Sequence, residues 1–524
     1  MKIYKHIRVL LAGFIAVWLC AFTVFAVEPS VTSVGSEELP YETYTYWQGY
    51  GYQDKTPVYC KPMYGVKTVI NAVSLGIGHI DEITDIYTDE SGNTYILDDK
   101  ASSVYVVDSN YNLAANISNI TLGGEKQTIE GAKGIFVKDE NIYLADTDNE
   151  RVLIFGMNGI VTKVLTRPDS KLIPDDFKFR PIKIAVDSKN YTYIACDGSY
   201  YGAIVYSPTM GFLGFYGANT VAATALDVLQ NITDRLFSND TKKSSSVLAL
   251  PYQFTDMVVG PKDFIYTATG KAGGAKLQTG QIRVMNPGGK DILKEDDNNF
   301  LDSKVGIYKT VSMDEDVAGI DVDKDGFFYI VDSTYGRIFW YDSECNPMCV
   351  FGGSLSPGKQ KGTFSSPCAI AVNGTDVLVG DGMKDSVTVF QLTEYGAAVR
   401  RAQLKTLNDD FETAVDEWQS IVKKDKNNQL AYKGLAKAYY TLGDNEKALE
   451  YARLGSDRET YNVAFEKLRR AFFEKWFSVI FVCIVITVTI IIIFLRIKKK
   501  KNLRIINNSE IRLMFKSVFH PFES

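Results

Sequence analysis

A short segment recurs six times along this chain and constrains its fold more than any other feature. Its clearest copy, VAGIDVDKDGFFYIVDSTYGRIFWYD, occupies residues 317–342. β-Branched and aromatic residues cluster in three stretches of this copy, while the intervening DKDG and STYG favour turns. Each copy is therefore predicted to form three short strands. The other copies occupy residues 83–108, 133–155, 181–206, 254–285 and 367–390.

The spacing of the copies predicts how the strands assemble. The second strands end, in order, at Asp98, Asp146, Asp197, Thr269, Asp332 and Asp381. Successive ends are 48, 51, 72, 63 and 49 residues apart. Strand-only repeats with a period of about 40–50 residues are typical of β-propellers. We predict a mainly β fold, namely a six-bladed β-propeller followed by a small α-helical unit and one transmembrane helix.

Three phrases of the repeat resemble a known family. PIKIAVD, NIYLADTDNERVLIF and GFFYIVDSTYGRIFWY are similar to the NHL repeat, which forms six-bladed propellers, and the resemblance covers residues 58–393. Propellers of this kind include lactonases, lyases, ligand sensors and interaction platforms. Function must therefore be argued from sites on the propeller and not from its fold.

Two apolar segments predict where the protein resides. Residues 1–26 combine basic residues, an apolar run and small residues before position 27, as an export signal does. Residues 474–496 form the predicted transmembrane helix, since the twenty residues 476–495 lack charge and can span about 30 Å. The basic residues directly after it predict a cytoplasmic C-terminus. We expect a single-pass cell-membrane protein whose propeller and helical unit are extracytoplasmic.

Charge excludes one class of partner. Between the signal and the tail that begins at Arg496 there are 46 basic and 61 acidic residues, a net charge of −15. Such a surface repels polyphosphates, so we expect no nucleic-acid partner. The tail, residues 497–524, is basic and suits anionic lipid.

Two segments before the first copy receive different predictions. Residues 27–57 contain YETYTYWQGYGY and are expected to be an aromatic linker along the surface, because Gly49 and Gly51 weaken a strand assignment. Residues 66–75 are apolar and β-prone, and they precede the first complete copy. We predict that this segment becomes the outer strand of blade six and closes the ring.

Strand order also assigns loops to the two faces of the propeller. The turn after each second strand and the connection to the next blade emerge on the same face. The long insert between copies three and four, helical near residues 219–237, and the loop GKAGGAKLQTG both lie on this face. Since functional residues concentrate in loops on rigid scaffolds, we expect a ligand here. The predicted binding residues are Tyr200, Tyr201, Lys271, Lys276 and Tyr335.

Other motifs favour structural roles. Asp321, Asp323, Asp325, Gly326 and Asp332 match an EF-hand loop, but predicted strands flank them where that motif needs helices. The recurrent aspartates at second-strand ends are expected to accept backbone hydrogen bonds in turns.

Cysteine and histidine usage gives little support for metal chemistry. Cys345 and Cys349 either close a small loop or remain free thiols, and free thiols are preferred. Histidines occur only at positions 6, 79 and 520, so we expect no metal site, no cofactor and no catalytic residues.

From Glu394 the pattern becomes helical. Tyr432, Leu435, Gly443 and Ala448 resemble the tetratricopeptide repeat, so residues 394–470 are predicted to form a helical stalk or a groove for a partner peptide. The domain order resembles a family of exported Gram-positive proteins that continue into a Yip-type membrane domain and whose genes neighbour carbohydrate ABC transporters. Residues 511–524 resemble the start of that domain, which suggests a truncated or split gene.

The resulting hypothesis is a membrane-anchored extracytoplasmic binding or scaffold protein, linked to carbohydrate uptake or sensing. Its expected partners are the membrane, a membrane protein or carbohydrate ABC transporter components, and a glycan ligand. The alternative is a cell-surface metal-dependent lactonase or lyase of the propeller type.

Overall fold

The computed structural model describes residues 39–48, 55–175, 177–199, 201–217, 254–269, 282–293, 316–354 and 360–519. The predicted export signal, the helical stretch near residues 219–237, and Tyr200, Lys271 and Lys276 lie outside these residues. The chain divides into two compact units, Met1–Gly434 and Leu435–Ser524.

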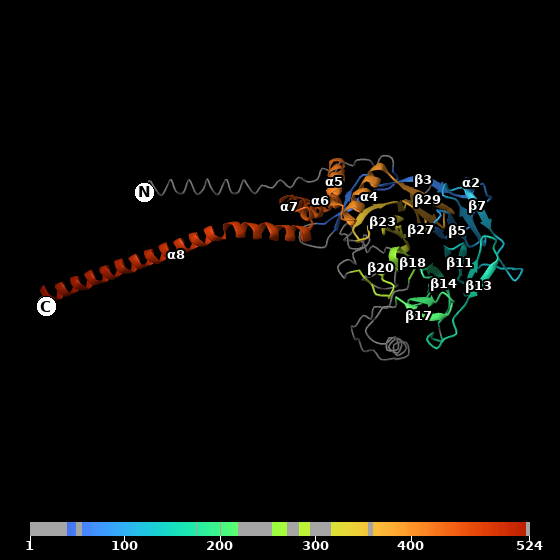
Figure 1. The fold of residues 1–524 in the computed structure, drawn as a ribbon, viewed down its shortest axis with the longest axis horizontal. Helices are drawn as coiled ribbons and strands as arrows, with labels where there is room; N and C mark the ends of the chain where they lie inside the picture. The colour runs from blue at the N-terminus through green and yellow to red at the C-terminus, as the bar shows by residue number, and fades with distance from the viewer. Residues whose placement is uncertain are drawn as a thin grey trace, which may run out of the picture. The chain divides into compact units, whose positions relative to one another are not determined.

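The first unit contains a six-bladed β-propeller, as predicted (Figure 1). Blades one to three are the antiparallel sheets β4 (Ile83–Thr88), β5 (Thr94–Asp98), β6 (Ser103–Val107), β7 (Leu113–Ile117); β10 (Gly134–Lys138), β11 (Asn141–Asp146), β12 (Arg151–Phe155), β13 (Val161–Leu165); and β14 (Pro181–Val186), β15 (Thr192–Cys196), β16 (Ala203–Tyr206), β17 (Phe212–Tyr216). In the described residues, blade four comprises β18 (Asp256–Val259), β19 (Ile265–Ala268) and β20 (Ile282–Met285).

Blades five and six include strands from the N-terminal part of the chain. Blade five comprises β21 (Val317–Val322), β22 (Phe328–Asp332), β23 (Arg337–Tyr341), β24 (Pro347–Phe351), β1 (Tyr44–Gln48) and β2 (Lys55–Tyr59). Blade six comprises β27 (Pro367–Asn373), β28 (Asp376–Asp381), β29 (Ser386–Leu392) and β3 (Tyr64–Ile70). The first strands of the six blades contact one another in a closed inner ring, in the order β4, β10, β14, β18, β21 and β27.

Apolar side chains fill the space between neighbouring blades. Leu97 of blade one and Ile135 of blade two belong to one buried cluster. Between blades five and six, the rings of Tyr64 and Phe351 stack with their centres 4.6 Å apart. Because a blade buries its faces only against its neighbours, each blade depends on the complete ring for its stability.

The predicted ring closure is confirmed. β3 pairs with β29 in antiparallel register and becomes the outermost strand of blade six, and Figure 1 shows the blue β3 beside the orange β29. The strand ends at Ile70, before the predicted end at residue 75, because Asn71 caps the short helix α2 (Ala72–Leu75).

The prediction of a surface linker for residues 27–57 is wrong for the part that the structure describes. Residues 44–48 and 55–59 form an antiparallel hairpin, and Tyr44 pairs with Val350 at the outer edge of blade five. Tyr44 and Tyr46 are buried in the core shared by blades four and five. Tyr44 and Tyr46 occupy alternate positions of β1, and the burial of both rings favours a strand here despite the glycines that follow.

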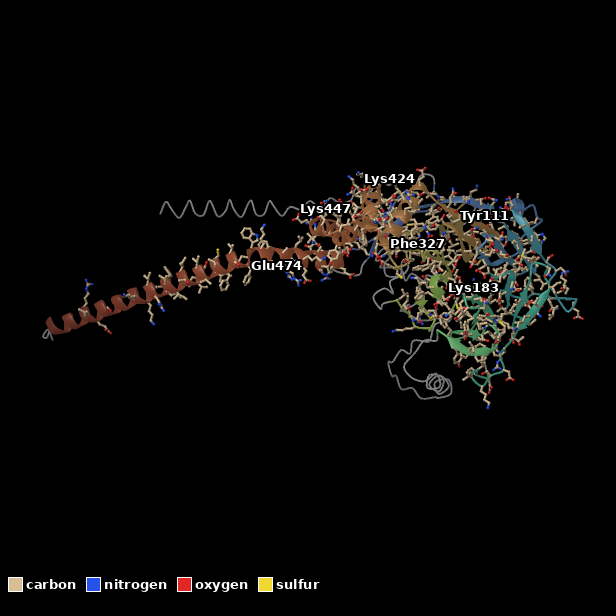
Figure 2. The ribbon with its side chains drawn as sticks, in the orientation of Figure 1. Tyr111, Lys183, Phe327, Lys424, Lys447 and Glu474 are labelled. Carbon is tan, nitrogen blue, oxygen red and sulfur yellow. The ribbon has the colours of Figure 1, made fainter. Side chains whose placement is uncertain are left out.

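A helix is fixed to blade five within the first unit. Arg400 of α4 (Glu394–Leu407) binds Asp323 at 2.5 Å and Asp325 at 2.9 Å. Its guanidinium centre lies 4.6 Å from the ring centre of Phe327, a residue labelled in Figure 2. The buried Arg400–Asp323 pair and the more exposed Arg400–Asp325 pair therefore link the helix to a hairpin turn of the propeller.

Two further contacts hold this helical segment. Gln403 of α4 donates a hydrogen bond to Asp342, which lies in another turn of blade five. α5 (Phe411–Lys424) packs against α4 and buries Trp418, whose Nε1 donates to Thr406 Oγ1 at 2.8 Å.

The remaining helices begin where helix was predicted, but the last of them continues to Phe519, through most of the predicted basic tail. α6 (Gln429–Thr441) crosses the boundary between the units, and α7 (Asn445–Leu454) packs against α8 (Arg458–Phe519) in the second unit. Within the described residues, the segment Arg458–Lys500 of α8 is the one helix long and apolar enough to cross a membrane. It contains the predicted span 474–496 and indicates a membrane anchor.

Candidate functional site

The aspartates that end the second strands of blades one, two, five and six have the structural role predicted for them, whereas Asp197 follows β15 and pairs with Arg180. Asp98, Asp146 and Asp332 are fully buried. Asp332 accepts backbone N–H groups from Asp316, Thr334 and Tyr335 at 3.0–3.1 Å. Such a carboxylate ties the connection between blades to the following turn, which explains its recurrence.

The loop that resembles an EF-hand is also explained by local structure. Asp323 accepts the N–H groups of Asp325 and Phe327 within the β21–β22 turn. Arg400 pairs with both Asp323 and Asp325. Burial raises the pKa of Asp323, while Arg400 opposes that increase. Asp323 Oδ1 thus accepts the turn N–H groups, and Asp323 Oδ2 accepts from Arg400 of helix α4.

Two of the five predicted binding residues can be placed. Tyr201 is half-buried, and its ring packs against Phe215 and Phe177 at 5.3 and 6.5 Å between centres. Tyr335 is half-buried in the β22–β23 turn. The two tyrosines belong to blades three and five, and only Tyr335 lines the groove described next.

A groove of about 350 Å³ lies at the outer edge of blade five, where the N-terminal hairpin joins the sheet. The lining residue Gly353 packs closely against the backbone of Gly336, whose φ is +63° and whose added Cβ would lie 2.8 Å from the carbonyl oxygen of Gly353. The lining residues are Pro40, Tyr41, Glu42, Tyr44, Pro57, Tyr59, Tyr335, Arg337, Gly352, Gly353 and Ser354.

The groove combines aromatic surface with a small set of polar groups. Tyr59 is 46% exposed, so part of its ring faces solvent at the groove. The guanidinium centre of Arg337 lies 4.8 Å from the ring centre of Tyr335. Glu42 and Ser354 are exposed at the same groove. Its volume and mixed lining resemble those of small-molecule sites, which measure about 300–1,000 Å³.

A second group of polar residues lies on the inner ring of strands. Lys183 of β14 reaches Asp85 of β4 at 2.6 Å and Asp256 of β18 at 3.2 Å. Figure 2 labels Lys183 inside the propeller. Asp321 of β21 adds a third buried carboxylate near this group. The cluster thus holds three carboxylates for one ammonium group.

Each of the three aspartates also satisfies the inner edge of the following blade. Asp85 accepts the N–H of Ile135 at 2.8 Å, and Asp256 accepts that of Ile320 at 2.9 Å. Asp321 accepts the N–H of Val372 at 2.7 Å. Unpaired backbone donors are costly inside a protein, so these carboxylates stabilise the inner strands.

Burial governs the protonation of this axial cluster. It raises the pKa of Asp321 to about 7 and that of Asp85 to about 6, against the hydrogen bonds and the Lys183 charge that favour ionisation. For Lys183, burial alone lowers the pKa, but Asp256 and Asp85 outweigh it and raise the pKa. The cluster therefore takes up protons in mildly acidic solution.

Sequence reasoning missed both the axial cluster and most of the groove. A signal for the cluster existed, because Asp85, Lys183 and Asp256 occupy the same register position in otherwise apolar first strands. The groove had no comparable signal. It forms only because the N-terminal segment that carries Glu42 and Tyr59 packs against blade five, whose own strands lie far later in the sequence.

The described residues contain no group of three or more His, Cys, Asp and Glu side chains placed to hold a metal ion. His79 is exposed and lies 3.3 Å from Asp81 at the surface. Cys345 and Cys349 are free thiols, in agreement with the preferred prediction.

No protein-family model matches the chain, and no curated protein matches it either. Virginiamycin B lyase from Staphylococcus aureus is 11% identical over 63% of this chain and 100% of its own, with a TM-score of 0.37. A protein of unknown function from Bacteroides thetaiotaomicron is 12% identical over 65% and 79%, with a TM-score of 0.38. PorZ, a surface component of the type-IX secretion system of Porphyromonas gingivalis, is 10% identical over 64% and 48%, with a TM-score of 0.35. At these identities the likeness concerns the fold alone.

Proposed function

We propose that this protein is a membrane-anchored extracytoplasmic binding or scaffold protein that holds a carbohydrate in the blade-five groove. The observation that supports the proposal is the groove itself, in which Tyr59, Tyr335 and Arg337 surround a cavity of ligand size. A role in carbohydrate uptake or sensing would follow, with a membrane protein such as a transporter component as the partner.

The chemistry of the lining supports a sugar ligand. Tyrosine rings offer flat apolar surface to the C–H faces of a sugar, and Tyr59 exposes such a ring. The Glu42 carboxylate accepts hydrogen bonds from hydroxyl groups, while the Ser354 hydroxyl both donates and accepts them. A polyhydroxylated ring therefore fits this groove better than a purely apolar molecule does.

The anchor supports a position at the cell surface. The apolar part of α8 is followed by Arg496 and by four lysines at 498–501, and basic residues remain on the cytoplasmic side of a span. In this orientation the propeller is outside. Protease added to intact cells should then digest the propeller and leave the C-terminal tail protected, whereas a protected propeller would reverse the orientation.

A glycan array tests the binding proposal. Full-length protein in lipid nanodiscs should bind specific glycans on the array, and the Tyr59→Ala substitution should reduce that binding. Tyr440→Ala, which alters a tyrosine of α6 outside the propeller, is the matched control and should bind as the wild type does. Absence of any bound glycan would contradict the proposal. Chelator-sensitive hydrolysis of a lactone panel would instead support the alternative enzyme.

A further inference from the structure

Two exposed leucines lie at opposite ends of helix α7 in the second compact unit. Leu442, in the turn between α6 and α7, is 46% exposed, and Leu454, the last residue of α7, is 41% exposed. The two residues share their chemistry and their exposure, but they differ in their distance from the apolar part of α8. Because α7 contains 10 residues, its ends lie about 15 Å apart.

The α6–α7 turn lies near the start of the span. Lys467 of α8 lies over the ring of Tyr440, close to the end of α6, with its Nζ 4.1 Å from the ring centre. The uncharged segment of α8 begins at Trp476, which is about 13 Å further along the helix axis than Lys467. The turn is therefore at a level close to the lipid headgroups.

Helix direction brings Leu442 closer to the span than Tyr440. Short connections join α6 to α7 and α7 to α8, so consecutive helices are antiparallel. The stacked rings of Tyr439 and Tyr451, with centres 5.5 Å apart, show that α6 and α7 lie side by side. α6 and α8 thus run in the same direction, which places Leu442 about 10 Å from the hydrocarbon.

The headgroup layer reaches close to this level. It is roughly 5–8 Å thick on each side of the hydrocarbon. Membrane helices tilt by about 20° on average, and a tilt towards α6 and α7 would lower a turn one helix diameter away by about 3 Å. With that tilt, the Leu442 side chain reaches the headgroups while Leu454 remains in water.

The side of α8 that carries the helical pair continues as apolar surface towards the span. Ala464 is buried and Leu468 is half-buried, which identifies the side of α8 that packs against α7. Phe472 follows Leu468 by four residues and therefore lies on that side, where it is exposed. Leu442 and Phe472 thus present apolar side chains on one side of the helix, directly before the span.

The same segment of α8 is basic. Residues 466–475 contain four basic and two acidic side chains, a net charge of +2. Arg469 and Arg470 are exposed in this segment. Arginine binds phosphate through two parallel hydrogen bonds, and basic residues beside a membrane are attracted to anionic lipid. Apolar and basic side chains together are typical of elements that lie in the membrane interface.

We infer that the α6–α7 turn docks on the phospholipid leaflet that α8 enters. Leu442 and Phe472 insert among the headgroups, while Arg469 and Arg470 bind the phosphates of anionic lipids. This contact holds α8 tilted towards the helical pair. The inference rests on α8 as the membrane anchor, applies to either orientation of the span, and is independent of carbohydrate binding.

Fluorescence quenching in nanodiscs tests the depth of the turn. Full-length Leu442→Cys and Leu454→Cys proteins, each with Cys483→Ser to remove the exposed thiol of the span, are labelled with a thiol-reactive fluorophore. The Cys483→Ser protein corrects for the other thiols. The discs contain phosphatidylcholine and phosphatidylglycerol with a nitroxide on the lipid headgroup. The label at position 442 should lose most of its intensity, whereas the label at position 454 should keep most of it.

Charge variants test the binding of lipid phosphate. In the protein labelled at position 442, the double substitution Arg469→Gln and Arg470→Gln should reduce the quenching, as should higher salt concentration or discs without phosphatidylglycerol. Arg453→Gln removes an exposed arginine at the far end of α7 and is the matched control. It should leave the quenching unchanged. Equal quenching in the double variant and the control would overturn the role of the two arginines.

A label within the span separates the inference from the anchor. The otherwise unsubstituted protein, labelled at Cys483, should be quenched by a nitroxide on the lipid acyl chain. If it were quenched while the labels at 442 and 454 responded equally, the docked turn would be overturned and the anchor would stand. If the label at Cys483 were not quenched either, α8 would not lie in the membrane and both would be wrong.

Discussion

Lys183 Nζ donates a hydrogen bond to Asp85 Oδ1 at 2.6 Å, although the residues lie 98 positions apart in blades three and one. The same ammonium group lies 3.2 Å from Asp256 of blade four. One side chain thus joins three blades inside the ring. The cluster therefore stabilises the propeller, because its carboxylates also accept hydrogen bonds from the backbone of neighbouring inner strands.

Lys183→Met should strongly destabilise the propeller. The substitution leaves the Asp85 and Asp256 carboxylates buried without their counter-charge, a change that costs about 3–5 kcal/mol. Chemical denaturation monitored by tryptophan fluorescence measures the loss. Lys189→Met, at an exposed position of the same blade, is the control and should change the free energy of unfolding by less than about 0.5 kcal/mol. Equal changes in the free energy of unfolding for both substitutions would show that the axial cluster does not stabilise the propeller.

Asp321→Asn should reduce the dependence of stability on pH. The pKa of Asp321 is about 7 in the folded chain against an ordinary value of 3.8, so the folded state binds the extra proton. Asp321 therefore stabilises the folded state as the pH falls from about 7 towards 4, by at most about 1.4 kcal/mol per pH unit. Asn lacks this titration, so the wild type should gain stability relative to the variant as the pH falls from 8 to 5. If the difference in unfolding free energy between the two proteins did not change with pH, Asp321 would not titrate in this range in the folded state.

Arg400→Met should loosen α4 from blade five. It leaves Asp323 buried without its partner and should lower the free energy of unfolding by about 3–5 kcal/mol. Arg401→Met changes the neighbouring arginine, whose side chain is 57% exposed, and should cost less than about 1 kcal/mol. Hydrogen exchange should show faster opening of α4 in the first variant only. Similar protection in both variants would show that the ion pair does not hold the helix.

Gly134→Ala should strain the inner ring. An added Cβ would lie 2.3 Å from the carbonyl oxygen of Ile182, so the first strands of blades two and three would have to separate. Overpacking of this kind costs about 1–3 kcal/mol. Gly65→Ala in β3 is the control, since its nearest neighbour would be 4.0 Å away. Thermal unfolding should show a lower midpoint for the first variant alone, and equal midpoints would contradict the close approach.

The sequence predicted the propeller because its repeat contains local information about strands, turns and period. Ring closure was predictable for the same reason, since an apolar β-prone segment remained at one end and the last copy lacked an outer strand. The end of that strand was misplaced because the Asn71 cap, a single hydrogen-bonding side chain, starts a helix at residue 72.

The candidate site was only partly predictable, because its residues meet through pairings that no local pattern specifies. Tyr335 was selected as a turn residue and does line the groove. Arg337 and Tyr59 were not selected, since the groove requires an N-terminal hairpin to add to the edge of blade five. Tyr201, selected by the same turn argument, lies in blade three and packs against Phe215.

The most direct test of carbohydrate binding in the groove is calorimetric titration of the strongest array ligand into full-length protein and its Tyr335→Ala and Tyr59→Ala variants. Each substitution should weaken binding by about 1–3 kcal/mol, because it removes one aromatic ring from the ligand-facing surface. Tyr440→Ala should bind with the wild-type affinity. Unchanged affinity in both groove variants would contradict the assignment of the ligand to this groove.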